Sequence, residues 1–335
     1  MDRRAFLSTM GACSVMSASS ARFARAQTQR RFAAAARYSA DNGGASFIVV
    51  RNGVVLGEVY PDGGDPEARL PLGAATHAFA PLLAAALVHD NLLALDEPAA
   101  LTLGEWGADP VKSVIAVRAL LNGTSGLAFA NGGAQDAPTA LLLAPQDQPG
   151  ARFIDDAAPY IIFTELARRK LAAGGADPDP ALYLTERVLT AIGCTPIGWT
   201  RGPDGAPRFD TGVYVTARGL ACTGELIRRA GVWRGEQLAD AYALGDALRG
   251  SFVEPRAGIG FWLAAPSRQP ISLNSDLWRA QSPAPSDLAM AAGNGGQRLY
   301  IAPSRALVVV RLAHNDNASA SWSDAQFLSL LWPDL

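Results

Sequence analysis

The stretch Pro71-Leu72-Gly73-Ala74-Ala75-Thr76-His77, followed by the apolar run from Ala78 to Val88, decides how this chain of 335 residues folds. Proline and glycine indicate a tight turn, and the uninterrupted apolar run after it is typical of a helix that is buried on all sides. We expect Ala74 to open this helix and His77 to follow one turn later on the same face. Alanine has no nucleophilic atom, whereas an imidazole can transfer protons.

Apolar strand patterns lie on both sides of this helix in the sequence. Residues 45–55 form two apolar runs around Asn52-Gly53, which predicts a β-hairpin. Residues 258–263 and the runs within 299–312 predict further strands of the same sheet. The chain between them is rich in Ala and Leu, with Gly and Pro at intervals, and this indicates helices and loops. We therefore predict a sheet part at about 45–72 and 258–335, and a helical lobe at about 73–257.

Several segments, in the same order along the chain, resemble the serine β-lactamase-like hydrolases of the class C and esterase type. That family includes penicillin-binding proteins, D-amino-acid peptidases and 6-aminohexanoate-dimer hydrolases. The most specific match is Leu120-Leu121-Asn122-Gly123-Thr124-Ser125-Gly126-Leu127, where the family repeatedly carries Leu-Leu-x-x-Thr-Ser-Gly-Leu. The other matching segments are residues 45–55, 90–98, 215–221, 258–263 and 293–297.

The resemblance covers roughly residues 45–315 and implies an α+β fold of the β-lactamase/transpeptidase type. Its sheet would be antiparallel, with five or more strands and with the terminal helices packed on it. A helical lobe would be inserted between strands, and the ligand cleft would lie between the lobe and the sheet.

The family builds its active site from three motifs, and the first of them, Ser-x-x-Lys, is altered here. Ala74 takes the position of the nucleophilic serine, and His77 takes the position of the lysine that activates it. The chain contains two lysines, Lys112 and Lys170, and neither lies near a motif. The resemblance therefore implies that acyl transfer by a serine is lost.

The second family motif, Tyr-x-Asn, is also absent. Counting from Phe153, Asp155 takes the tyrosine position and Ala157 the asparagine position, and the nearest phenol is Tyr160. A carboxylate at this place can act as a base. Alternatively, Asp155 or Asp156 caps a helix that starts near Pro159 and ends at about 168–170.

At the third motif, Lys/His-Thr/Ser-Gly is replaced by Asn294-Gly295-Gly296. The glycines suit an edge strand that a ligand approaches closely. The family's oxyanion hole uses backbone N–H groups, expected here from Ala74 and a residue near Gln297. The residues predicted to bind ligand are Ser125, Asp156, Tyr160, Asn294, Gly295, Gly296 and Gln297.

Three interpretations of this site stay open. The first is a non-catalytic relative that binds a small-molecule or peptide-like ligand in the cleft, or that regulates another protein. The second is a hydrolase of an ester, amide or peptide in which His77 acts as general base on water, with Asp155 or Asp156 orienting the ring. His77 can equally be a packed histidine without a chemical role. In the third, the nucleophile lies elsewhere, and Ser125 is the visible candidate, although its turn also occurs in active relatives.

The N-terminus predicts an export signal. Asp2-Arg3-Arg4-Ala5-Phe6-Leu7 resembles the twin-arginine consensus, and Ala24-Arg25-Ala26 forms a small-x-small site for cleavage after Ala26. We therefore predict a signal at 1–26, a single domain at 27–335 and a periplasmic or secreted protein. Cys13 is an alternative acceptor for a lipid anchor.

Composition excludes several other classes of function. The first 26 residues carry four arginines and one aspartate, which leaves 25 basic against 30 acidic residues and a formal charge of −5. That balance argues against a nucleic-acid partner, and no apolar run reaches the length of a membrane span. No spacing of metal ligands and no phosphate-binding loop is present, so no metal or cofactor is expected. Cys194 and Cys222 form either a disulfide or two buried thiols.

Overall fold

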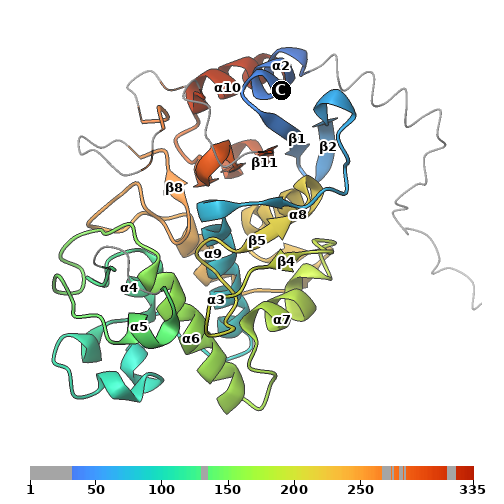
Figure 1. Ribbon diagram of the computed structural model, residues 1–335. Helices are drawn as coiled ribbons and strands as arrows, with labels where there is room; N and C mark the ends of the chain where they lie inside the picture. Colours follow the sequence, from blue (N-terminus) through green and yellow to red (C-terminus); the bar gives the residue numbers. More distant parts are fainter. Residues whose placement is uncertain are drawn as a thin grey trace, which may run out of the picture.

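The computed structural model describes residues 32–129, 135–265, 273, 275–278, 282, 284–314 and 322–335. The predicted export signal at 1–26, with Arg3, Arg4, Cys13 and the cleavage site after Ala26, lies outside these residues. An antiparallel sheet of six strands occupies the upper part of the molecule in Figure 1, in the order β2-β1-β11-β10-β9-β8. Its strands are β1 (Gly44–Arg51), β2 (Val54–Val59), β8 (Trp262–Leu263), β9 (Ala289–Ala292), β10 (Arg298–Ala302) and β11 (Leu307–Ala313).

The first two strands form the predicted hairpin. Asn52 and Gly53 have φ angles of 51° and 78°, the two positive values that a tight type I′ hairpin turn requires. Along β1, Ile48 and Val50 enter one apolar cluster, while Phe47 and Val49 enter another. The sheet is therefore buried on both faces, which accounts for the continuous apolar run along β1.

Helices cover both faces of the sheet. The terminal helices α2 (Ala33–Asp41) and α10 (Asp324–Leu331) pack on one face, as predicted, and α8 (Ala217–Arg228) packs on the other. A side chain at Gly224 would meet Leu299 and Val308 at 2.7 and 2.8 Å, so glycine lets α8 approach the strands closely. The predicted lobe boundary is wrong here, because α8 belongs to the sheet part although it lies within residues 73–257.

The remaining helices form the lobe below the sheet in Figure 1. They are α3 (Phe79–His89), α4 (Val117–Leu121), α5 (Ala137–Leu141), α6 (Ala158–Ala173), α7 (Pro180–Leu184) and α9 (Ala241–Ala247). A π-helical turn, η6 (Thr185–Leu189), follows α7. Short 3-10 turns are η1 (Pro61–Gly63), η2 (Gly73–Ala78), η3 (Ala99–Leu101), η4 (Gly104–Trp106), η5 (Lys112–Val114), η7 (Asn294–Gly296), η8 (Pro303–Arg305) and η9 (Trp332–Asp334).

Two smaller sheets connect the lobe to the main sheet. Three strands, β3 (Leu70–Pro71), β5 (Val213–Val215) and β4 (Gly198–Trp199), pair in that order, and β6 (Val232–Trp233) pairs with β7 (Glu236–Gln237). Neither pairing was predicted. The predicted sheet part at 45–72 thus ends in a strand of a different sheet, and β3 leads directly into η2.

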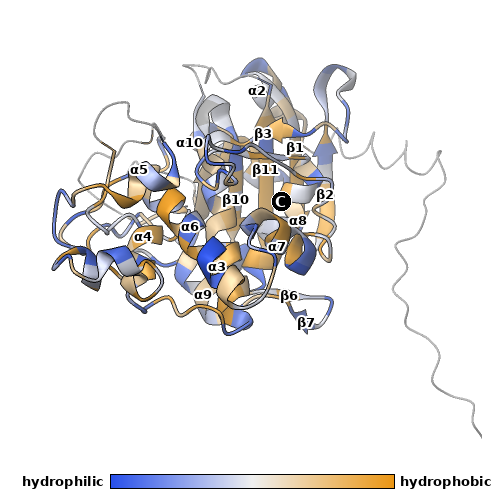
Figure 2. Cartoon of the chain, turned by 60° about the horizontal axis from the view of Figure 1, so that its bottom comes forward, coloured by the Kyte–Doolittle hydropathy of each residue, from blue (hydrophilic) through white to orange (hydrophobic). Residues whose placement is uncertain are grey.

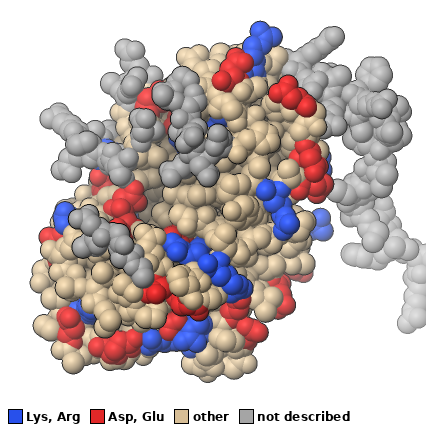
Figure 3. Space-filling model, viewed as in Figure 1, with Lys and Arg blue, Asp and Glu red and all other residues tan. Residues whose placement is uncertain are grey.

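Apolar residues gather in the core and polar residues on the surface. Apolar residues, orange in Figure 2, follow the central strands β10 and β11, while polar residues occupy outer loops and helix ends. Acidic and basic side chains lie side by side over the helical lobe in Figure 3. Among the helices of the described part, none has the length and apolar character needed to cross a bilayer. Cys194 and Cys222 are free thiols, so the predicted disulfide is absent; Cys194 is buried as the other alternative expected, whereas Cys222 is only partly buried.

Candidate functional site

The segment that carries Ala74 and His77 is a 3-10 turn rather than the start of the helix. Gly73, with φ of 53°, turns the chain out of β3, and η2 continues to Ala78 before α3 begins. A 3-10 helix has three residues per turn, so side chains three apart lie directly above one another. Ala74 and His77 therefore share one face, as predicted, and both line a small pocket.

The imidazole of His77 is stacked on the ring of Tyr160. The ring centroids are 3.9 Å apart and the planes differ by 10°. Tyr160 belongs to the first turn of α6, and its hydroxyl forms a hydrogen bond with the backbone of Gly260. Gly260 has φ of 72°, and a side chain there would collide with the carbonyl of His77. The turn η2, the start of α6 and the turn at Gly260 therefore pack closely against one another around the imidazole.

Burial controls the charge of both rings. It lowers the pKa of His77 below its usual value, while the nearby carboxylates of Asp155 and Asp210 oppose that shift. Burial also raises the pKa of Tyr160, and the negative charge of Asp155 acts in the same direction. At neutral pH the imidazole is therefore uncharged and the phenol keeps its proton.

The two aspartates of the second motif both lie at the pocket, and one of them also holds the start of the next helix. Both Asp155 and Asp156 line the pocket. Asp156 Oδ1 also accepts the backbone N–H of Ala158, the first residue of α6, at 2.8 Å and that of Phe129 at 3.1 Å. The predicted capping role thus belongs to Asp156, one residue before the N-cap position. Helix α6 begins at Ala158 and ends at Ala173, close to the predicted bounds.

The third motif forms a turn between β9 and β10, not an edge strand, so this prediction was wrong. Gly295 and Gly296 have φ angles of 78° and 83°. Arg311 Nη1 donates to their carbonyl oxygens at 3.0 and 2.7 Å, and a side chain at Gly296 would collide with this guanidinium. The glycines therefore make room for a buried arginine. Neither glycine lines the pocket, and the side chain of Asn294, in the same turn, lies outside the part of the chain that the structure describes.

Two predicted ligand-binding residues point away from the pocket. Gln297 is 1% exposed, and its amide donates to the carbonyl of Ala313 at 2.9 Å and accepts the N–H of that residue at 2.9 Å. Ser125 is also 1% exposed, and its Oγ accepts the N–H of Leu127 at 3.3 Å. Both side chains thus hold the backbone, and neither belongs to the site.

Sequence reasoning missed several residues of the pocket. Gly260, Phe261 and Trp262 line it, although the segment 258–263 indicated only a strand and a family resemblance. Asp210 is close enough to His77 to act on its pKa, and no motif indicated it. In the described residues, no group of three or more His, Cys, Asp and Glu side chains could hold a metal ion.

The pocket at Ala74 is almost completely filled. Its volume is about 30 Å³, which is the space of one water molecule. Pockets that bind small molecules usually measure about 300–1,000 Å³. The stacked rings of His77 and Tyr160, together with Phe153 and Trp262, enclose this small space.

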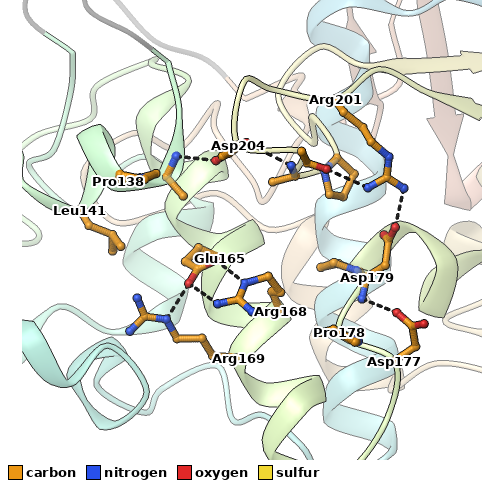
Figure 4. Close-up of a pocket in the computed structure, with 15 residues that line it drawn as sticks. Pro138, Leu141, Glu165, Arg168, Arg169, Asp177, Pro178, Asp179, Arg201 and Asp204 are labelled. Atoms are coloured by element: carbon orange, nitrogen blue, oxygen red, sulfur yellow. Dashed lines mark hydrogen bonds and ion pairs between the residues drawn. The ribbon is translucent and has the colours of Figure 1, made fainter.

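A much larger cavity of about 580 Å³ lies elsewhere in the lobe, between α5, α6 and the loops at 177–180 and 201–207 (Figure 4). It shares no residue with the pocket at Ala74. Its arginines are paired with acids: Arg168 and Arg169 with Glu165, and Arg201 with Asp179. Among its described residues the cavity therefore has no unpaired arginine to attract a ligand of a particular charge.

Comparison with known proteins agrees with this fold. The family model described as Beta-lactamase matches residues 28–328. A putative 6-aminohexanoate-dimer hydrolase from Bacillus anthracis is 17% identical, with a TM-score of 0.68 over 89% of this chain and 79% of its own. A putative beta-lactamase from Bacteroides dorei is 18% identical, with a TM-score of 0.69 over 88% of this chain and 92% of its own.

A penicillin-binding protein homologue from Caulobacter crescentus is 18% identical, with a TM-score of 0.68 over 91% of this chain and 98% of its own. At these identities the likeness concerns the fold alone. The search of curated proteins found no match.

Proposed function

Because this chain belongs to the beta-lactamase family, we propose that it is a non-catalytic member, which has lost serine acyl transfer and acts as a binding or regulatory protein of the cell envelope. The observation that carries the proposal is the pair Ala74 and His77. A methyl group stands at the nucleophile position, and the imidazole one turn later is packed against Tyr160 rather than free to activate a hydroxyl.

The lining of the pocket supports the same proposal. Among the described residues that form it, no serine, threonine, cysteine or lysine is present. A nucleophile for acyl transfer and an ammonium group to activate it are therefore both missing from this lining. The volume of about 30 Å³ also leaves no room for an acyl group beside Ala74. The location in the envelope rests on the predicted leader at 1–26.

Labelling with a fluorophosphonate and with a penicillin tests the loss of acyl transfer. We expect intact-mass spectrometry to show no covalent adduct, while an active serine esterase in the same tube is fully labelled. A stoichiometric adduct that maps to a serine, Ser125 included, would overturn the proposal.

The hydrolase that uses His77 as base is the second candidate. It is favoured by the uncharged imidazole and by the nearby charge of Asp155. We expect no hydrolysis of p-nitrophenyl butyrate by the parent above the buffer rate. Turnover that disappears in His77→Ala and persists in the matched variant His89→Ala would replace the non-catalytic proposal with this one.

A further inference from the structure

Another cavity lies at the opposite edge of the main sheet from the pocket at Ala74. Its volume is about 410 Å³, within the range of small-molecule sites, and β1, the edge strand β2, α8 and the β6–β7 hairpin surround it. The pocket at Ala74 instead lies beside β8 and β9, which form the other edge. The two places are therefore separate, and binding at this cavity does not depend on the loss of catalysis proposed for the other.

The wall of this cavity is apolar. Val50 on β1 and Val55 on β2 are cross-strand partners and face the same side of the sheet, and Trp233 and Ala221 contribute from the hairpin and from α8. Helix α8 covers β1, β11 and β10 but leaves the β2 edge open, so Val55 remains 54% exposed. Covering this surface with an apolar body would be favourable, by about 25 cal/mol for each Å² removed from water.

The rim of the cavity is positively charged. Arg218 is paired with Glu58 and Glu67. The buried carboxylate of Glu225, the one acid among the described residues of the lining, is paired with Arg228. Arg229 and Arg234 also line the cavity. Within the described residues their side chains form no ion pair and no hydrogen bond.

The hairpin fixes Arg234 at this rim. Arg234 and Gly235 have φ angles of 50° and 90°, the geometry of a tight turn in which a non-glycine residue at the first position is uncommon. The guanidinium is near enough to Cys222 on α8 to lower the pKa of its thiol, although burial and Glu225 raise it overall. Arg234 on the hairpin and Cys222 on α8 therefore line the same cavity and lie close enough to interact electrostatically.

We propose that this cavity binds a small amphiphilic anion, with an acyl or aromatic body against Val50, Val55 and Trp233 and with one anionic head group held by Arg229 and Arg234. Guanidinium groups recognise carboxylates and related anions through paired N–H donors. An apolar wall beside unpaired cations fits a molecule that is neither purely polar nor purely apolar. Octanoate is a suitable probe, and 1-octanol is its neutral counterpart.

Cys222 provides a direct readout, since its thiol is in the lining. In the full chain, octanoate should slow alkylation of Cys222 by N-ethylmaleimide at about pH 8, with half-maximal protection below about 1 mM. Peptide mapping separates this thiol from Cys194, which is 1% exposed, and from Cys13. At equal concentration 1-octanol should protect at least tenfold more weakly. Equal protection by both probes, or none by octanoate, overturns the proposal.

Two pairs of variants test the geometry. Val55→Glu places a carboxylate at the mouth and should weaken octanoate protection at least tenfold. The matched change Val54→Glu, at a neighbour that is 60% exposed and does not line the cavity, should alter it less than twofold. Replacing Arg229 and Arg234 together with glutamine should remove the preference for octanoate over octanol.

The edge strand β2 is also a place where a second copy of the chain could add a strand. Sedimentation velocity distinguishes pairing between two copies from binding of a small anion. If Val54→Glu and Val55→Glu both convert a dimer to a monomer while octanoate protection is unchanged, the surface is a contact between copies and the proposal fails.

Discussion

At the scale of single residues, His77 is held in a place where protonation is unfavourable. Burial lowers its pKa below the ordinary value of about 6.5, so the unfolded chain takes up this proton at a higher pH than the folded protein. Stability should therefore fall as the pH drops below about 6.5, until the folded pKa is reached. Above about pH 7 the imidazole is neutral in both states and contributes no pH dependence.

The variant His77→Phe should remove this dependence, because it keeps an aromatic ring to stack on Tyr160 but cannot be protonated. Urea unfolding between about pH 7.5 and 5.5 should show a larger loss of stability for the parent than for the variant. His89 and His314 are present in both proteins, so any contribution from them cancels in the difference. Parallel curves would contradict the buried, neutral imidazole.

Restoring a nucleophile tests how much of the family geometry remains. The double variant Ala74→Ser with His77→Lys places a hydroxyl and an ammonium on one face of η2 and removes the ring that fills the pocket. We expect hydrolysis of p-nitrophenyl butyrate to rise at least tenfold, about 1.4 kcal/mol of transition-state stabilisation. His77→Lys alone is the control and should show no rise.

Asp155→Tyr belongs in the same background, since the tyrosine position is also lost. If the double and triple variants fold normally by circular dichroism and gain nothing, the backbone around Ala74 is no longer arranged for acyl transfer.

The sequence predicted which residues line the pocket better than it predicted the orientation of their side chains. Ala74, His77, Asp155 and Tyr160 were all named, and the structure brings them to one pocket. Their stacking could not be predicted, because it depends on how α6 packs against η2. The directions of side chains such as Gln297 depend in the same way on backbone partners far away in the sequence.

At the scale of secondary-structure elements, the sequence predicted an element correctly where a single turn motif or a periodic pattern defines it. The Asn-Gly hairpin and helix α6 are examples. The partner of an element was harder to predict. Helix α8 was assigned to the lobe by its place in the chain, yet Gly224 lets it lie on the sheet, and β3 pairs with β5 rather than with the main sheet.

Gly260 illustrates how a turn between elements positions the site. In Gly260→Ala, the added methyl group would lie 2.8 Å from the carbonyl carbon of His77 in a backbone with positive φ. Gly193→Ala is a matched control, because its φ is 75° but nothing lies within 4 Å. Urea unfolding should give a loss of about 1–2 kcal/mol for Gly193→Ala from the left-handed backbone alone. For Gly260→Ala we expect about 1–3 kcal/mol more, from the collision. Equal losses would contradict the tight packing at His77.

At the scale of the whole molecule, the predicted export signal ends before the first residue of the described core. Phe32, which is 0% exposed, packs on the face of the sheet that α2 and α10 cover, and helix α2 begins at the next residue. Cleavage after Ala26 would therefore remove none of the residues that form the described core. The buried ion pair of Arg298 and Asp324, which holds α10 to the sheet, would remain intact as well.

We predict that export depends on the paired arginines of the leader. Replacing Arg3 and Arg4 with lysine should leave uncleaved precursor in the cytoplasm. The twin-arginine route recognises the two arginine side chains themselves, and lysine keeps their positive charge but not their guanidinium groups. The matched variant with lysine at Arg22 and Arg25 keeps the same charge and should be exported as the parent is. Cell fractionation and the N-terminal sequence of the processed protein give the result. Normal processing after Ala26 in the Arg3 and Arg4 variant would show that another route carries the protein.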